Sequence, residues 1–203
     1  MFTDSENSPK QKSRMRGFTM LELVVVVAVI MVVTAVSMPS FMQAMRIYRL
    51  NDAATQVAGV LKFTRYEAIR LNVSGTVGLG GPLNARVIQA GTITNVFTDS
   101  NYNGSAQNTE KQIRLSGNVN LVPAGTPPGG LAAAVGVATL TSVPLPTGAV
   151  AFDHRGALTP AAVNVLYIGN VAFPDLGYRA VVLLPSGSVQ IWTSASGNWQ
   201  QTN

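Results

Sequence analysis

A run of 21 residues near the N-terminus limits this chain more than any other feature of its sequence. Residues 18–38 are almost entirely apolar, and their only ionisable side chain is Glu22. A helix rises about 1.5 Å per residue, so this run spans roughly the 30 Å hydrocarbon core of a bilayer. We therefore expect residues 18–39 to form a transmembrane helix.

Residues 1–17 are polar and lack a hydrophobic period, which is typical of a solvated leader. They include four basic residues just before the apolar run, namely Lys10, Lys12, Arg14 and Arg16. Positive charge beside a membrane span holds that flank in the cytoplasm. The chain beyond Pro39 is thus expected on the periplasmic or extracytoplasmic side, as the head of a single-pass membrane protein.

An ordinary secretory signal also has a basic start and an apolar core, and Ala35-Val36-Ser37 matches its small-residue exit. In this alternative the mature chain is an exported soluble protein that starts near Met38. The length of the apolar run and the position of Glu22 favour a retained helix. A carboxylate inside a bilayer costs about 2.5–3.5 kcal/mol and usually has a partner or a function.

Glu22 gains a partner if the chain is cut between Gly17 and Phe18. The new α-amino group would then lie four residues before the carboxylate. A neighbouring subunit, displaced along an assembly axis, would present its own amine to the same carboxylate. Glu22 is therefore expected to set the stagger between subunits.

The segment Gly17-Phe18-Thr19-Met20-Leu21-Glu22, followed by a valine-rich run, resembles the class III signal of type IV prepilins and type II secretion pseudopilins. The resemblance implies that a prepilin peptidase cleaves after Gly17 and N-methylates Phe18, and that Glu22 acts in assembly. Pro39 stands where pilins commonly carry a helix-bending proline, and the alternative for Pro39 is a simple helix end.

Residues 40–72 are expected to continue the helix as an amphipathic segment. They contain no proline and one glycine, and apolar residues recur at helical spacings. These residues are Phe41, Met45, Tyr48, Val57, Leu61, Ala68 and Leu71. One face of the segment therefore needs a sheet to cover it, and interleaved charges indicate a solvated opposite face.

Residues 73–203 have the texture of a β-rich head, because turn-forming residues separate short apolar or alternating runs. Strands are expected at 75–79, 85–90, 94–98, 112–115, 119–122, 149–152, 164–168, 178–184 and 189–193. Residues 123–148 hold five of the eleven prolines and predict a long excursion or a flexible stretch. The expected fold class is α+β, with a long N-terminal hydrophobic helix packed on an antiparallel β-sheet head, as in type IV pilin-like proteins.

The later head resembles the GspH/FimT group of minor pilins and pseudopilins. The matching stretches are Phe152-Asp153-His154-Arg155-Gly156 and Pro185-Ser186-Gly187-Ser188, the second as the turn of a final hairpin. The resemblance implies a structural subunit of a type IV pilus or type II secretion pseudopilus. Its implied partners are other pilin or pseudopilin subunits, a prepilin peptidase and an inner-membrane assembly platform.

A pilus-associated binding module for DNA or a secreted substrate is the alternative function. Some relatives contact DNA through a basic final hairpin, but residues 180–203 contain no Lys or Arg, and Ser188 and Gln190 follow the turn glycine. Without residues 1–17 the net charge falls from +5 to +3. Phosphate binding needs cations, so the sequence argues against DNA as a partner. Trp192 and Trp199 are expected to pack in the head rather than stack on bases.

Four oxygen-bearing residues, Asp99, Asn101, Asn103 and Glu110, have the spacing of a calcium-binding loop, with Gly104 at its sharp turn. Such ligands can surround a hard cation. However, strands rather than helices are expected on both sides, and only two of the four are charged. A polar hairpin turn without a cofactor is therefore the favoured interpretation.

Catalytic patterns do not emerge from the sequence. His154 is the only histidine and is expected in a turn or on the surface, there is no cysteine, and no nucleophile-elbow or phosphate-cradling motif occurs. We therefore expect a structural protein rather than an enzyme.

Overall fold

The computed structural model describes residues 17–73, 81–195 and 197–202. The chain divides into two compact units, Met1–Gln43 and Ala44–Asn203, and helix α1 (Met20–Arg70) contributes to both. The strand expected at 75–79 lies outside the described residues.

In its described residues, the first unit consists of residues 17–19 and the N-terminal part of α1. Its apolar side chains are exposed along the whole run, and none of the most apolar stretch is buried against protein. By length and composition α1 is able to cross a membrane. An apolar surface of this extent needs lipid or another protein to cover it.

Helix α1 ends in the second unit with a motif that the sequence encodes locally. Asn72 has a φ of 47°, and its amide donates to the Ile69 carbonyl, while the Val73 amide donates to the Ala68 carbonyl. This is a Schellman arrangement, in which asparagine tolerates the left-handed conformation. Buried Val73 and Ala68 complete the accompanying apolar contact, so the helix ends within two residues of the expected position.

One face of α1 in the second unit is buried from Leu50 onwards. The buried residues follow helical spacing and are mostly small: Leu50, Ala53, Ala54, Val57, Ala58, Val60, Leu61, Thr64 and Ala68. Of the expected apolar positions, Val57, Leu61 and Ala68 join this face. Phe41, Met45, Tyr48 and Leu71 remain exposed, so the covered stripe is shorter than the spacing predicted.

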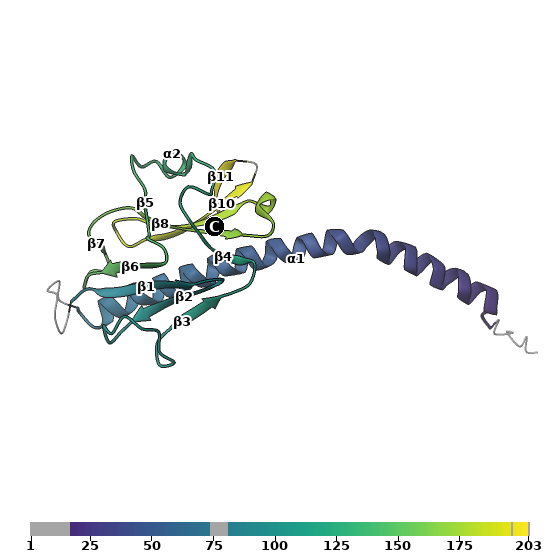
Figure 1. The fold of residues 1–203 in the computed structure, drawn as a ribbon, viewed down its shortest axis with the longest axis horizontal. Coiled ribbons are helices and arrows are strands. Elements are labelled where there is room, and N and C mark those ends of the chain that lie inside the picture. Colours follow the sequence, from purple (N-terminus) through teal and green to yellow (C-terminus); the bar gives the residue numbers. More distant parts are fainter. Residues whose placement is uncertain (1–16, 74–80, 196, 203) are drawn as a thin grey trace, which may run out of the picture. The chain divides into compact units, whose positions relative to one another are not determined.

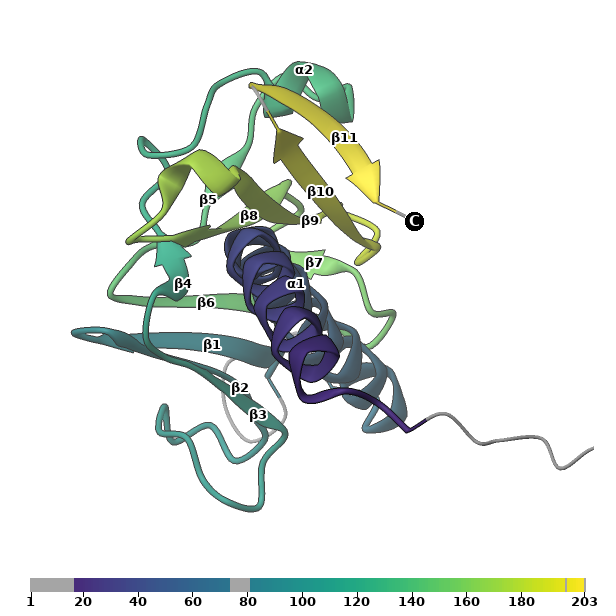
Figure 2. The same cartoon turned by 90° about the vertical axis from the view of Figure 1, so that its right-hand side faces the viewer.

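Sheet A is antiparallel throughout and packs against one side of the buried stripe of α1 (Figures 1 and 2). Its strand order is β3 (Gln112–Leu115), β2 (Ile93–Asp99), β1 (Leu83–Ala90), β6 (Thr147–Phe152) and β7 (Leu158–Thr159). Leu83, Ala85 and Val87 of β1 alternate with less buried residues. They pack in the hydrophobic core around the buried face of α1, here called the helix core. This period-two burial is what a sheet packed on one side requires.

Sheet B lies on the other side of the helix core, as the end-on view of Figure 2 shows. Its order is β11 (Asn198–Thr202), β10 (Val189–Ala195), β9 (Tyr178–Leu183), β8 (Asn164–Asn170) and β4 (Val119–Val122). Two-residue β5 (Thr141–Ser142) pairs with β8 in parallel, a departure from the expected antiparallel sheet.

Both faces of sheet B are buried at its central strand, β9. In β9, Val181 and Leu183 face the helix core, whereas Ala180 and Val182 belong to a second cluster. That cluster includes Leu131 of the short helix α2 (Leu131–Val135) and both tryptophans. The excursion 123–148 therefore carries a helix that covers the outer face of sheet B.

The expected strands 112–115 and 119–122 match the structure residue for residue, and the six other described ones are shifted by one or two residues at their ends. Strands β5, β7 and β11, helix α2 and the 3-10 turn Pro174–Leu176 were not expected. The turn 185–188 joins β9 to β10, and β11 follows, so the prediction that it forms the final hairpin was wrong.

Two turns that lie far apart in the sequence meet beside α1. A Cβ built on Gly187 would lie 1.8 Å from the Gly156 carbonyl oxygen, and both glycines have positive φ. The Arg65 side chain of α1 donates from Nε to that same carbonyl at 3.1 Å. The stretches 152–156 and 185–188 thus meet at one contact, which only glycine permits at these two positions.

Candidate functional site

The peptide bond between Gly17 and Phe18 lies just before α1. Both residues are exposed and outside the helix, and nothing lies within 4 Å of a Cβ built on Gly17. Phe18 is 77% exposed. An exposed, non-helical bond at this point is accessible to a protease.

Thr19 caps the helix that begins immediately after this bond. Its hydroxyl accepts a hydrogen bond from the Glu22 amide at 3.2 Å, and its carbonyl accepts the first helical bond, from Leu23. Thr19-Met20-Leu21-Glu22 is a capping-box pattern, which reasoning about the membrane segment did not bring out. The pattern explains why the helix starts at Met20.

Glu22 lies in the first turn of α1 and is exposed. A carboxylate there is favoured by the positive end of the helix dipole. Neither of the two ion pairs found in the described part of the chain involves Glu22. Among these residues, its carboxylate is therefore free to pair with a group of another molecule.

Pro39 lies inside α1, and the helix continues for more than thirty residues beyond it to Arg70. The alternative of a simple helix end is therefore excluded. Because proline lacks the amide hydrogen, one backbone bond of the helix is missing at this point.

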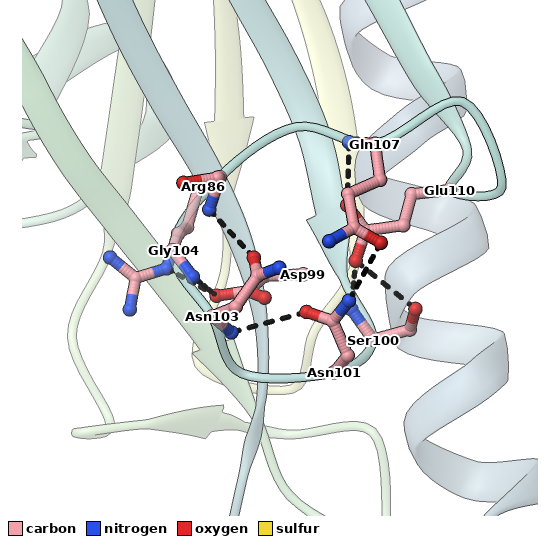
Figure 3. A network of polar contacts seen from close by, with 9 residues as sticks. Arg86, Asp99, Ser100, Asn101, Asn103, Gly104, Gln107 and Glu110 are labelled. Atoms are coloured by element: carbon pink, nitrogen blue, oxygen red, sulfur yellow. Dashed lines mark hydrogen bonds and ion pairs between the residues drawn. The ribbon is translucent and has the colours of Figure 1, made fainter.

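The loop from Asp99 to Glu110 leads from the end of β2 toward β3, and Figure 3 shows its polar side chains gathered around one another beside Arg86. Asp99 is fully buried, and its Oδ2 accepts hydrogen bonds from Arg86 Nε at 2.6 Å and the Gly104 amide at 3.1 Å. Gly104 has a φ of +75°, which suits glycine at this turn. Tyr102 closes the loop by donating its hydroxyl to the Gly81 carbonyl at 2.7 Å.

Glu110 holds the other side of the same loop. One carboxylate oxygen accepts hydrogen bonds from the amide and hydroxyl of Ser100, and the other accepts one from the Gln107 amide at 3.1 Å. Asn101 and Asn103 each accept an amide bond from the residue two positions on. The four proposed calcium ligands therefore lie in one loop, but their oxygens bind separate backbone and side-chain donors (Figure 3).

The described residues hold no group of three acidic, His or Cys side chains that could bind a metal. The polar-turn interpretation agrees with these hydrogen bonds, whereas the calcium site stays a prediction. His154 is exposed, and Trp192 and Trp199 are 7% and 8% exposed, so both tryptophans pack in the head as expected.

Arg179 is a charged residue that sequence reasoning missed. It is only 5% exposed, at the start of β9, and its Nε donates to Asn51 Oδ1 at 2.6 Å. Burial lowers the pKa of its guanidinium. The sequence gives one indication that Arg179 is buried, which is its position in an otherwise apolar strand. A charged residue in such a strand must be buried or lie at the strand end.

Comparison with known proteins identifies the prokaryotic N-terminal methylation motif over residues 12–38. Among solved structures, the chain is similar to the type IV minor pilin FimU of Pseudomonas aeruginosa, with 13% identity over 76% of this chain and 95% of that chain and a TM-score of 0.49. No curated protein matches the sequence. The motif thus coincides with the leader-helix boundary and the start of the long apolar helix α1.

Proposed function

We propose that the chain is a minor pilin or pseudopilin, a structural subunit that assembles through its N-terminal helix into a type IV pilus or type II secretion pseudopilus. The observation that carries this proposal is the methylation motif at residues 12–38, which coincides with the exposed start of α1. The role is structural rather than enzymatic.

Processing begins when a prepilin peptidase cleaves between Gly17 and Phe18 and methylates the new amine of Phe18. Before assembly, α1 anchors the protein in the inner membrane and the head lies in the periplasm. The length and apolar surface of α1 support this anchoring. Pro39 relaxes the helix locally when it leaves the bilayer for the filament, because its backbone bond is already absent.

Glu22 pairs with the α-amino group of Phe18 on a neighbouring subunit. An ion pair in a low-dielectric filament core compensates both charges, whereas either group alone would be costly there. The exposed position of Glu22 on the first turn supports this role. Other pilin or pseudopilin subunits and an inner-membrane assembly platform are therefore the proposed partners.

Intact-mass measurement of the membrane-extracted protein, with sequencing of its N-terminal peptide, tests the proposal. We expect a chain that starts at Phe18 and carries one additional methyl group. In the matched Gly17→Leu variant the leader should remain attached, because the small residue before the cut is lost. A wild-type chain that starts near Met38 would show instead that the apolar run is a discarded secretory signal.

A further inference from the structure

Arg179 extends the row of β9 side chains that faces helix α1. Leu183 and Val181 of this row enter the helix core, and Arg179, two residues earlier, occupies the next position on the same face. Its Nε binds Asn51 of α1, and one terminal nitrogen donates to the Tyr178 carbonyl at 3.0 Å. Both acceptors are neutral.

The charge of Arg179 has no acidic partner in the described part of the head. The two ion pairs found there are Arg70–Glu67 and Arg86–Asp99. A guanidinium remains protonated at neutral pH even when burial opposes its charge. A buried charge without a counter-charge is costly, and an anion that approaches the guanidinium would offset this cost.

A pocket of about 490 Å³ gives access to this guanidinium from outside. It lies between α1 and the strands β9, β10 and β11. Arg179 and Lys62 contribute its positive charges, and Asn51, Gln190 and Gln201 contribute side-chain amides. Its other lining residues are apolar or uncharged, and none is acidic. Lys62 is exposed and adds a second positive charge.

We propose that this pocket, here called the Arg179 pocket, binds a glutamate or aspartate side chain of an acidic peptide segment. The carboxylate would accept hydrogen bonds from the Arg179 guanidinium and from the amide nitrogen of Asn51, whose oxygen already binds Arg179. Lys62 lines the same pocket and adds a second, solvent-exposed charge that attracts the carboxylate. The proposal rests on the head alone and does not depend on filament assembly.

A peptide carboxylate fits the pocket better than a nucleic acid does. Single-stranded nucleic acid is held by a row of cations and by aromatic side chains that stack on bases. The lining of the Arg179 pocket contains two cations and no aromatic residue. One buried guanidinium beside a hydrogen-bonding amide suits a single carboxylate instead.

Fluorescence anisotropy with the full-length protein in an uncharged detergent tests this proposal. The probes are a fluorescein-labelled tetraglutamate peptide, its tetraglutamine counterpart and a labelled oligothymidine. We expect tetraglutamate to bind at least about tenfold more tightly than tetraglutamine, since each 1.4 kcal/mol of charge-assisted bonding is a factor of ten. Raising the salt concentration should weaken this preference.

Three variants locate the binding. Arg179→Met keeps the aliphatic volume and should weaken tetraglutamate binding at least about tenfold. Lys62→Gln should weaken it about threefold, as expected for an exposed charge at short range. Lys111→Gln removes an exposed lysine that does not line the pocket and should have no effect.

The fold of Arg179→Met is checked by tryptophan fluorescence, because both tryptophans lie in the head. If that variant unfolds, the comparison between Lys62→Gln and Lys111→Gln still tests whether the peptide binds at the Arg179 pocket. Equal binding of the two peptides, or equal effects of the two lysine variants, would overturn the proposal. Tighter binding of oligothymidine than of tetraglutamate would overturn it in favour of a phosphate chain.

Discussion

Asp99 and Arg179 are both buried charged residues, but in the described chain only Asp99 has a partner of opposite charge. Asp99 pairs with Arg86 and also accepts the Gly104 amide through the same oxygen. Its other oxygen has no hydrogen-bond partner among the described residues. Loss of the Asp99 charge should therefore leave Arg86 and the Gly104 amide without their acceptor.

The two ion pairs of the described chain allow a matched test of burial at the scale of single residues. Asp99→Asn should lower the free energy of unfolding of the head by about 2–3 kcal/mol, the usual worth of hydrogen bonds to a buried charged group. Arg70→Gln removes the exposed pair with Glu67, in which solvent screens the charges. It should leave the unfolding midpoint unchanged.

Urea denaturation of the full-length variants in detergent, followed by tryptophan fluorescence, measures both effects. Equal midpoints for Asp99→Asn and Arg70→Gln would show that the Asp99–Arg86 pair contributes no net stability, as some buried pairs do not.

At the scale of elements, the loop from Asp99 to Glu110 is expected to be stable without a metal ion. Glu110 already accepts bonds from Ser100 and Gln107, and Asp99 already faces the Arg86 cation. A calcium ion would have to displace these donors. We expect the same unfolding midpoint of the head in excess calcium and in excess EGTA.

Magnesium serves as the control for a general effect of divalent charge on the loop. A rise of the midpoint with calcium, but not with magnesium, would instead establish coordination by Asp99, Asn101, Asn103 and Glu110. Loss of that rise in Asn103→Ala would then confirm the ligand set.

Helix α2 is the second element whose role the tertiary contacts define. Leu131 is 2% exposed in the cluster on the outer face of sheet B. The Trp199 indole nitrogen donates to the carbonyls of Pro128 and Gly129, each at 3.2 Å, and so ties this segment to β11. The excursion is thus a covering layer of the head rather than a loose connection.

Leu131→Ala should destabilise the head by about 2–3 kcal/mol, near the lower end for buried leucines because a short surface helix can partly close the cavity. The neighbouring exposed Ala134 provides the control, and Ala134→Ser should change stability little. Chemical denaturation of both variants measures the difference. A Leu131→Ala protein as stable as Ala134→Ser would mean that α2 detaches readily from sheet B.

At the scale of the whole molecule, the exposed apolar part of α1 and the folded head place different demands on the protein. The apolar part of α1 needs lipid or other helices around it, whereas the head buries its own hydrophobic core. Membrane insertion and filament assembly should therefore respond differently to a change at Glu22.

Glu22→Gln should insert into the membrane as well as the wild type does, because an uncharged side chain lowers the cost of insertion. Its amount in filaments should fall at least about tenfold, the effect of losing about 1.4 kcal/mol or more of pairing with an α-amino group. Immunoblots of sheared filaments and of membranes measure the two pools. Glu67→Gln, which removes a head carboxylate, is the matched control.

Wild-type levels of Glu22→Gln in filaments would contradict amine pairing while leaving the proposed cleavage at Gly17 intact. Loss of both variants from the membrane would point to misfolding rather than to an assembly defect.

Local sequence determined the long helix and most strands of this protein. The apolar run 18–38 and the helical spacing after it are properties of neighbouring residues, and the Thr19 cap and the Asn72 turn lie within a few residues of the ends they fix. Strands β3 and β4 could be predicted to the residue because Ser116-Gly117-Asn118 separates them and Pro123 ends the second.

Tertiary structure alone decided which faces of the sheets are covered and where charges are buried. Strand β11 was missed because it is a mostly exposed, polar edge strand in which only Trp199 is buried, so it has no apolar alternation to detect. The Arg179 pocket likewise depends on Asn51 and Lys62 of α1, which lie more than a hundred residues away in the chain. Local patterns carry no information about such contacts, since they arise only when distant segments pack together.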